Sequence, residues 1–210
     1  MSELIIKQFN SEEFNDYSQD IINKKVEAIN MYMSVVSNGV YGNYNTDILL
    51  ARLPDKQSEQ YSEINAVKQF IDQIDGVNGN SKVFFLLKDN KPVSLAIYTQ
   101  SQMQSDAYIL ELIKTKDDEQ SNGYASILVK ESFAALKDEA FEIIAKINEN
   151  NNQSLGFIGV LNQNSLAYNK KLNAVCKVVS KSYDVYEARF YISDMAINFY
   201  KQKQQEQEKE

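Results

Sequence analysis

The residues of this chain best suited to chemistry lie in one polar turn between two apolar runs. The turn is Glu119-Gln-Ser-Asn-Gly-Tyr-Ala125, with Leu110–Thr115 before it and the amphipathic run Ser126–Leu136 after it. This pattern predicts a strand that enters a helix through a tight loop. The first N–H groups of a helix lack intrahelical partners and lie at the positive end of its dipole, so they attract anions. Small residues at Gly123 and Ala125 would let a phosphate approach the backbone. The loop is therefore a candidate phosphate site, and a purely structural turn is the alternative.

Two features of the composition limit the remaining chemistry. The chain has no histidine and a single cysteine, Cys176. Ser-His-Asp and Cys-His catalysis, histidine acid–base chemistry and structural zinc sites are thereby excluded, and we expect no metal. Any general base must be Asp, Glu, Tyr, Lys or Cys176. Because Cys176 lies in an apolar run, we interpret it as a small core residue.

The bulk properties predict a cytoplasmic globular protein. At 210 residues, with 43% hydrophobic and 24% charged residues, the chain can form one domain with a sizeable core. No apolar run approaches membrane-spanning length, the N-terminus does not resemble a leader, and one cysteine allows no internal disulfide. The net charge of −7 disfavours nucleic-acid binding and suits a cationic small molecule or a basic protein segment.

Hydrophobic periodicity predicts the elements that position the loop. One or two helices are expected after Ser11, which is a plausible helix cap, and Lys88–Pro92 has the composition of a hairpin turn. Leu155–Val160 is ambiguous. The predicted strands are Leu4–Phe9, Lys82–Leu87, Val93–Thr99, Tyr108–Thr115, Phe141–Ile147, Val175–Tyr183 and Val185–Ser193. The predicted helices are Ser11–Ser37, Ser58–Ile74, Tyr124–Leu136 and Asn162–Leu172.

The spacing Gln120-x-x-Gly123-x-Ala125 resembles the pyrophosphate loop of the GNAT superfamily of acyl-CoA-dependent N-acetyltransferases. The predicted order of elements also matches the GNAT layout from Leu4 to Ser193. The resemblance implies an α/β (α+β) fold with a mixed, mostly antiparallel seven-stranded sheet, flanked by helices and splayed between strands 4 and 5. Residues 1–195 would form this single domain, and 196–210 a charged tail rich in Gln, Glu and Lys, either helical or disordered.

A second patch also resembles the family pattern. Asn162, Ser165 and Tyr168 fall in step with the family's Asn, small residue and aromatic residue after the fifth strand. The family's Gly-aromatic ending is replaced by Asn173-Ala174, with one extra residue before it. The alternative for Tyr168 is a core-facing helix residue.

The resemblance implies acetyl-CoA as co-substrate and assigns residues to it. Main-chain groups near Ile113 and Thr115 would hold the pantetheine arm, and Tyr168 would protonate the departing thiolate. The implied cofactor-binding residues are Ile113, Thr115, Gln120, Ser121, Asn122, Gly123, Tyr124, Ala125, Ser126, Asn162 and Ser165.

The candidate general base is Glu111. It is expected to share a strand face with Ile113, but family members with a catalytic Glu carry it two positions earlier, where this chain has Ile109. Glu111 is thus a candidate by its chemistry. The alternatives are a solvated strand residue or salt-bridge partner, with a water chain serving as the proton path.

The function that the resemblance implies is transfer of an acetyl group from acetyl-CoA to a primary amine by direct attack. The acceptor would be an amine-bearing small molecule or a protein amine, and the chain could form a homodimer. One alternative is a non-catalytic acyl-CoA-binding or protein-interaction module on the same fold. Another is the fold without CoA, with the tail serving self-association. The run Asp117–Glu119 must point away for the loop to hold phosphate, and Tyr41 and Tyr44 suit either substrate contact or packing.

Overall fold

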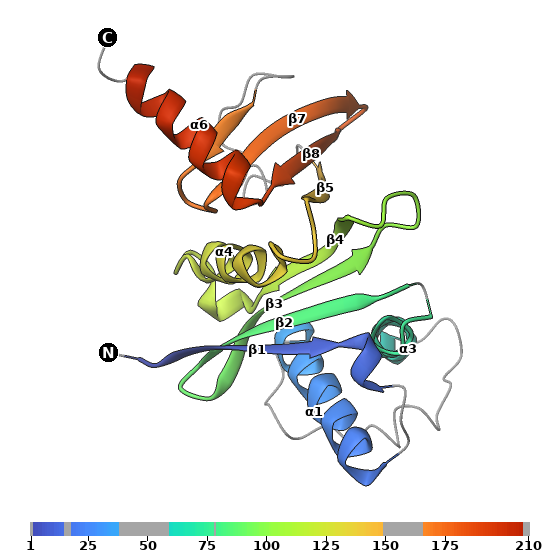
Figure 1. The fold of residues 1–210 in the computed structure, drawn as a ribbon. Helices are drawn as coiled ribbons and strands as arrows, with labels where there is room; N and C mark the ends of the chain where they lie inside the picture. The colour runs from blue at the N-terminus through green and yellow to red at the C-terminus, as the bar shows by residue number, and fades with distance from the viewer. Residues whose placement is uncertain (1, 15–17, 38–58, 78, 149–165, 208–210) are drawn as a thin grey trace. The chain divides into compact units, whose positions relative to one another are not determined.

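The computed structural model describes residues 2–14, 18–37, 59–77, 79–148 and 166–207. Hydrogen bonding joins eight strands in the order β1-β2-β3-β4-β5-β8-β7-β6 (Figure 1). Strand β4 is parallel to β5, and the other pairs of known register are antiparallel. The mixed, mostly antiparallel sheet is therefore confirmed, with eight strands where seven were predicted. The chain divides into two compact units: Met1–Thr99 with Leu112–Leu128, and Gln100–Glu111 with Val129–Glu210.

The first unit begins with an antiparallel meander. Strand β1 (Leu4–Asn10) pairs with β2 (Ser81–Lys88), which pairs with β3 (Lys91–Gln100). The predicted turn between β2 and β3 consists of Asp89 and Asn90, with φ angles of 49° and 62°. Two consecutive positive φ angles are typical of the type I′ turn that matches the twist of a hairpin.

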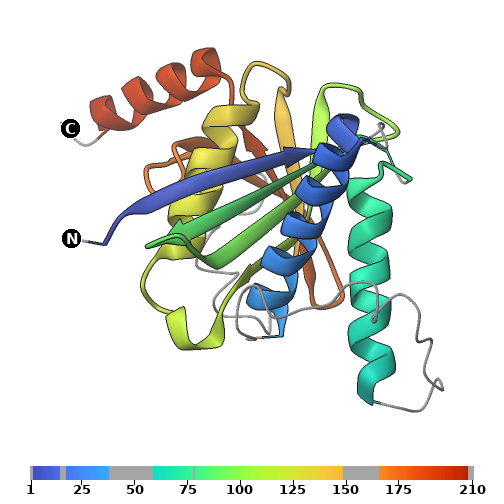
Figure 2. The same cartoon turned by 90° about the horizontal axis from the view of Figure 1, so that it is seen from below.

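Two helices lie side by side in this unit and bury one face of the meander (Figure 2). They are α1 (Gln19–Val36), preceded by a 3-10 helix at Ser11–Phe14, and α3 (Glu59–Ile74). The rings of Tyr32 and Phe70 stack between them at 4.2 Å. Alternate strand residues complete the core, because successive side chains of a strand point to opposite faces. They include Val83, Phe85, Leu87, Leu95 and Ile97.

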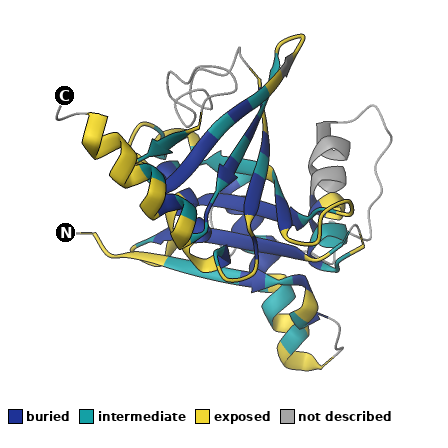
Figure 3. Ribbon diagram, turned by 45° about the horizontal axis from the view of Figure 1, so that its top comes forward, coloured by how far each residue is buried: buried dark blue, intermediate teal, exposed yellow. Residues whose placement is uncertain are grey.

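The second unit carries the remaining strands. They are β5 (Glu142–Asn148), β6 (Ala167–Asn169), β7 (Ala174–Ser182) and β8 (Val185–Tyr191). Helix α6 (Asp194–Gln207) contacts β6 and β7 and is exposed along most of its length (Figure 3). The predicted tail is thus helical as far as Gln207. Cys176 is fully buried in β7, as predicted for a core residue.

Strand β4 (Ala107–Thr115) and helix α4 (Tyr124–Leu136) contribute to both units. The residues of β4 that pair with β5 are Ala107–Leu110, opposite Glu142–Ala145. Both strands continue past the last pair, to Thr115 and to Asn148. Ala107–Leu110, the residues that pair with β5, belong with β5 to the second unit.

The helix predicted at Asn162–Leu172 is wrong where the structure describes it. Ala167–Asn169 is strand β6, the eighth strand, and a turn follows it. In that turn the Oδ1 atom of Asn169 accepts hydrogen bonds from the backbone N–H groups of Lys171 and Leu172, at 3.0 and 3.2 Å. Asn side chains that bond the backbone locally compete with helical hydrogen bonds, and this competition favours the turn. Leu155–Val160 lies outside the described residues.

The described helices include none that is long and apolar enough to cross a membrane.

Candidate functional site

Helix α4 begins where the sequence predicted, directly after Gly123. The carbonyl oxygen of Gly123 accepts from the N–H groups of Ser126 and Ile127, at 3.0 and 3.1 Å. Helical geometry gives the N–H groups of the preceding residues no intrahelical acceptor. Ser121 and Gly123 both have positive φ, 65° and 78°. Such alternation turns successive N–H groups toward one side and forms an anion-binding concavity.

The backbone at Gly123 is open to a ligand. A Cβ atom placed on Gly123 would meet no atom within 4 Å, and the residue is exposed. Because no side chain occupies this space, a phosphate can approach the N–H groups at the start of α4. The loop therefore leaves room for a ligand beside the first residues of α4.

The acidic run before the loop is largely neutralised. Oδ1 of Asp117 accepts from the Nζ of Lys114 at 2.6 Å and from the Nε2 of Gln120 at 2.9 Å. Glu119 accepts from the Nζ of Lys88 through both carboxylate oxygens, at 2.9 and 3.0 Å. Two of the three carboxylates thus face lysine ammonium groups. The exposed Asp118 makes no ion pair within the described part of the chain.

Lys88 is the residue that sequence reasoning missed. It lies at the end of β2, 31 positions from Glu119, and its Nζ lies 5.6 Å from the ring centre of Tyr124. Its hydrogen bonds to Glu119 and to Tyr124 raise the pKa of its ammonium group. No local sequence pattern predicts that Lys88, which precedes the hairpin turn, contacts the loop before α4.

The end of β4 is fixed to β3 by side-chain and main-chain bonds. The hydroxyl of Ser94 donates to the carbonyl of Lys114 at 3.0 Å and lies 2.9 Å from the hydroxyl of Thr115. The N–H of Lys116 donates to the carbonyl of Val93 at 2.9 Å. These bonds position the residues proposed to meet the pantetheine arm. The end of β4 and the loop both belong to the first unit. This unit therefore holds nine of the candidate residues: Ile113, Thr115, Gln120, Ser121, Asn122, Gly123, Tyr124, Ala125 and Ser126.

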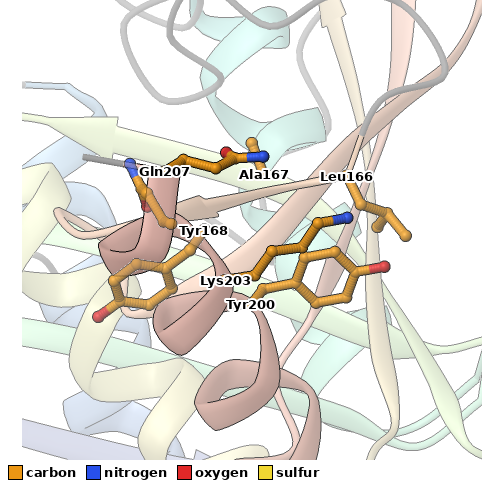
Figure 4. Close-up of a pocket in the computed structure, with 7 residues that line it drawn as sticks. Leu166, Ala167, Tyr168, Tyr200, Lys203 and Gln207 are labelled. Atoms are coloured by element: carbon orange, nitrogen blue, oxygen red, sulfur yellow. The ribbon is translucent and has the colours of Figure 1, made fainter. Parts of the chain in front are cut away.

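Tyr168 lies in the second unit, on β6 and not on the helix that hydrophobic periodicity predicted. Its phenol donates a hydrogen bond to the Oδ1 of Asn173 at 2.9 Å, and the Nζ of Lys201 lies 5.9 Å from its ring centre. Strand β6 and helix α6 enclose a hollow of about 180 Å³ beside it (Figure 4). The hollow is lined by Leu166, Ala167, Tyr168, Tyr200, Lys203, Gln204 and Gln207.

The other predicted site residues are placed as follows. Glu111 is exposed on β4, in the second unit. Asn162, Ser165, Tyr41 and Tyr44 lie outside the described residues. Among the residues that are described, no group of three or more Cys, Asp or Glu side chains is arranged to hold a metal ion.

Comparison with known proteins finds similarity in structure but not in sequence. No protein-family model matches the chain, and no curated protein does. A protein of the GNAT family of acetyltransferases from Desulfovibrio desulfuricans matches with a TM-score of 0.51 at 10% identity, over 91% of this chain and 100% of that chain. Protein PH1933 of Pyrococcus horikoshii matches with a TM-score of 0.51 at 14% identity, over 90% and 98%.

The PaiA N-acetyltransferase of Thermoplasma acidophilum, solved in complex with coenzyme A, is similar to the same extent. Its TM-score is 0.50 at 11% identity, over 90% of this chain and 99% of that chain. The similarity thus spans almost the whole of each solved chain.

Proposed function

From the GNAT fold of this chain we infer an acetyltransferase that moves an acetyl group from acetyl-CoA to a primary amine. One observation carries the proposal. The loop before α4 combines exposed donors, two positive φ angles and open space at Gly123, and it does so on a fold shared with an N-acetyltransferase that was solved with coenzyme A.

The residues of the first unit fit the cofactor. The N–H groups at the start of α4 would bind the pyrophosphate, with Gln120, Ser121, Asn122 and Ser126 around it, and main-chain groups of Ile113 and Thr115 would meet the pantetheine arm. Asn162 and Ser165 complete the proposed cofactor contacts. When bound, acetyl-CoA supplies an activated thioester, so no nucleophilic side chain is required.

The remaining chemistry is proton transfer. The attacking amine must be neutral, so a base or a water chain has to take its proton. Glu111 is our candidate base, and its exposure on β4 suits a group that exchanges protons with solvent. Tyr168 is our candidate acid, which holds a proton at its phenol oxygen for the departing thiolate. It must exchange its hydrogen bond with Asn173 to do so.

The acceptor is an amine, either on a small molecule or on a protein. The negative net charge of −7 favours the approach of a protonated amine over long range. We expect the protein to act in the cytoplasm, without nucleic acid or membrane as a partner, and to be able to form a homodimer.

A non-catalytic acyl-CoA-binding protein is the second candidate. Two observations favour it: the phenol of Tyr168 is already engaged with Asn173, and Tyr168 lies on a strand and not on the expected helix. Such a protein would bind acetyl-CoA but release no thiol in the presence of amines.

Two measurements test the proposal and separate the two candidates. Titration calorimetry with acetyl-CoA is expected to show binding in the micromolar range, and no binding at high micromolar concentration would reject both candidates. A thiol-release assay with a panel of amines (polyamines, aminoglycosides, amino acids and lysine peptides) is expected to find an acceptor. Binding without release across the panel would favour the non-catalytic protein.

A further inference from the structure

We propose that Glu119 is a positioning residue that holds the loop before α4 in its anion-binding shape, through Lys88. The proposal goes beyond the assigned cofactor contacts, because neither Glu119 nor Lys88 is expected to touch the ligand. The test of this proposal by ligand binding rests on the proposed function. The test by the shape of the loop in the free protein does not.

The contacts of Glu119 span the strained part of the loop. Its carboxylate is held by the Nζ of Lys88 at 2.9 and 3.0 Å, and its Oε2 accepts from the Nδ2 of Asn122 at 3.2 Å. The same Asn122 amide also donates to the carbonyl of Glu119 at 3.1 Å. The Nζ of Lys88 also lies 5.6 Å from the ring centre of Tyr124, the first residue of α4. The Glu119 carboxylate thus joins the end of β2 to the turn.

The backbone of this turn is in a conformation that other contacts must stabilise. Ser121 has a φ of 65°, a conformation that L-residues with a side chain rarely adopt, and Gly123 has a φ of 78°. The N–H groups of the turn converge on a ligand only while both angles are kept. The Lys88–Glu119 pair is half-buried, with side-chain exposures of 29% and 21%, so it is less screened than a fully solvated pair.

If Glu119 acted only through its charge, the effect of its removal on ligand affinity would have the opposite sign. A carboxylate beside a phosphate site repels the ligand, so its removal should strengthen binding. Asp118 provides the matched control, because it is the adjacent acidic residue, is exposed and makes no ion pair within the described residues. If Glu119 acted only as a charge, its removal and that of Asp118 would change the affinity in the same direction.

The experiment compares Glu119→Ala with Asp118→Ala by calorimetry with acetyl-CoA. We expect Glu119→Ala to bind at least about tenfold more weakly and Asp118→Ala to bind as tightly as the wild type or somewhat more tightly. Glu119→Gln keeps an acceptor oxygen for Lys88 and should fall between the two. Lys88→Met should weaken binding like Glu119→Ala, and the double variant should be no weaker than the single ones, because both act through one contact. Unchanged or tighter binding in Glu119→Ala would overturn the proposal.

A second readout needs no ligand. Amide hydrogen exchange at Ser126 and Ile127, whose N–H groups donate to the carbonyl of Gly123 in the free protein, is expected to be at least about tenfold faster in Glu119→Ala than in the wild type, and unchanged in Asp118→Ala. If the wild type fails to bind acetyl-CoA, the proposed function is rejected and the exchange measurement still decides the role of Glu119. Equal exchange in the wild type and Glu119→Ala would reject that role whether or not the ligand binds. Thermal unfolding of each variant checks that the fold is kept.

Discussion

The loop before α4 and the β6 turn offer a ligand different kinds of groups. The loop presents main-chain N–H groups in front of open space, and two of the three acidic side chains before it are paired to lysines. The β6 turn presents side chains, and the one assigned a chemical role, Tyr168, is bonded to its neighbour Asn173. A main-chain site depends on backbone angles and tolerates many sequences, whereas a side-chain site depends on the identity and the freedom of one residue. The proposed cofactor site is therefore the more robust of the two to sequence divergence.

The largest effect is expected at Tyr168. If its phenol is the acid, Tyr168→Phe should lower turnover by about 100-fold, the lower range for a general acid, and leave the affinity for acetyl-CoA nearly unchanged. The measurement is steady-state thiol release beside calorimetry.

Asn173→Gly is the control for this variant. It also removes the Tyr168–Asn173 hydrogen bond but keeps the phenol, and glycine suits the φ of 51° at this position. Its activity should match or exceed that of the wild type. Equal losses in the two variants would assign the effect to the shape of the turn and remove Tyr168 from the chemistry.

The main-chain site is tested at Gly123. Gly123→Ala places a Cβ atom in the space proposed for the phosphate and strains a φ of 78°, so we expect a loss of affinity for acetyl-CoA of about tenfold or more. The backbone strain itself costs about 1–2 kcal/mol of folding free energy.

Gly76→Ala carries a similar strain at a distant position. Its φ is 69°, and its Cβ would approach the Cβ of Ser11 to 3.4 Å. We expect it to lower the melting temperature at least as much as Gly123→Ala and to leave the affinity unchanged. If both variants lost affinity in proportion to their stability, the specific role of Gly123 would be excluded.

The smallest effect concerns the strand that carries Tyr168. Cys176 on β7 pairs with Ala167 on β6, and burial raises the pKa of its thiol to about 12. The ordinary pKa of an unburied thiol, which we expect in the unfolded chain, is 9.0. Between these values the unfolded state releases a proton that the folded state retains, so the free energy of unfolding falls as the pH rises. The Cys176 contribution is at most about 1.4 kcal/mol per pH unit.

Urea unfolding from pH 8 to pH 10 measures this contribution. Cys176→Ala is expected to be less stable at pH 8, because it leaves a small cavity, but to lose less stability as the pH rises. The native thiol should also react far more slowly with a disulfide reagent than the unfolded one. Equal pH slopes in the two proteins, or a fast native reaction, would contradict the buried position of Cys176 beside β6.

The two regions also differ in how far the sequence predicted them. Helix α4 was predicted with its observed bounds, because a helix and its capping glycine depend on neighbouring residues. The β6 strand was predicted as helix, because three residues have no period of their own and form a strand only by pairing with β7. The Lys88–Glu119 pair could not be predicted either, because it joins residues 31 positions apart and depends on how the strands pair.

The two-residue turn of Asp89 and Asn90 determines more than the hairpin it closes. It pairs Lys88 with Lys91 and is itself bonded to the start of β1, where the Asp89 N–H donates to the carbonyl of Glu3 at 3.0 Å. A shift of one residue in a strand register moves side chains to the opposite face. The length of this turn therefore decides how the residues of β3 are placed opposite β2, whereas Lys88 is held in register by its pairing with Leu4 of β1. An insertion of one residue there would shift β3, and with it Ser94, which bonds the end of β4, without altering any residue of the loop before α4.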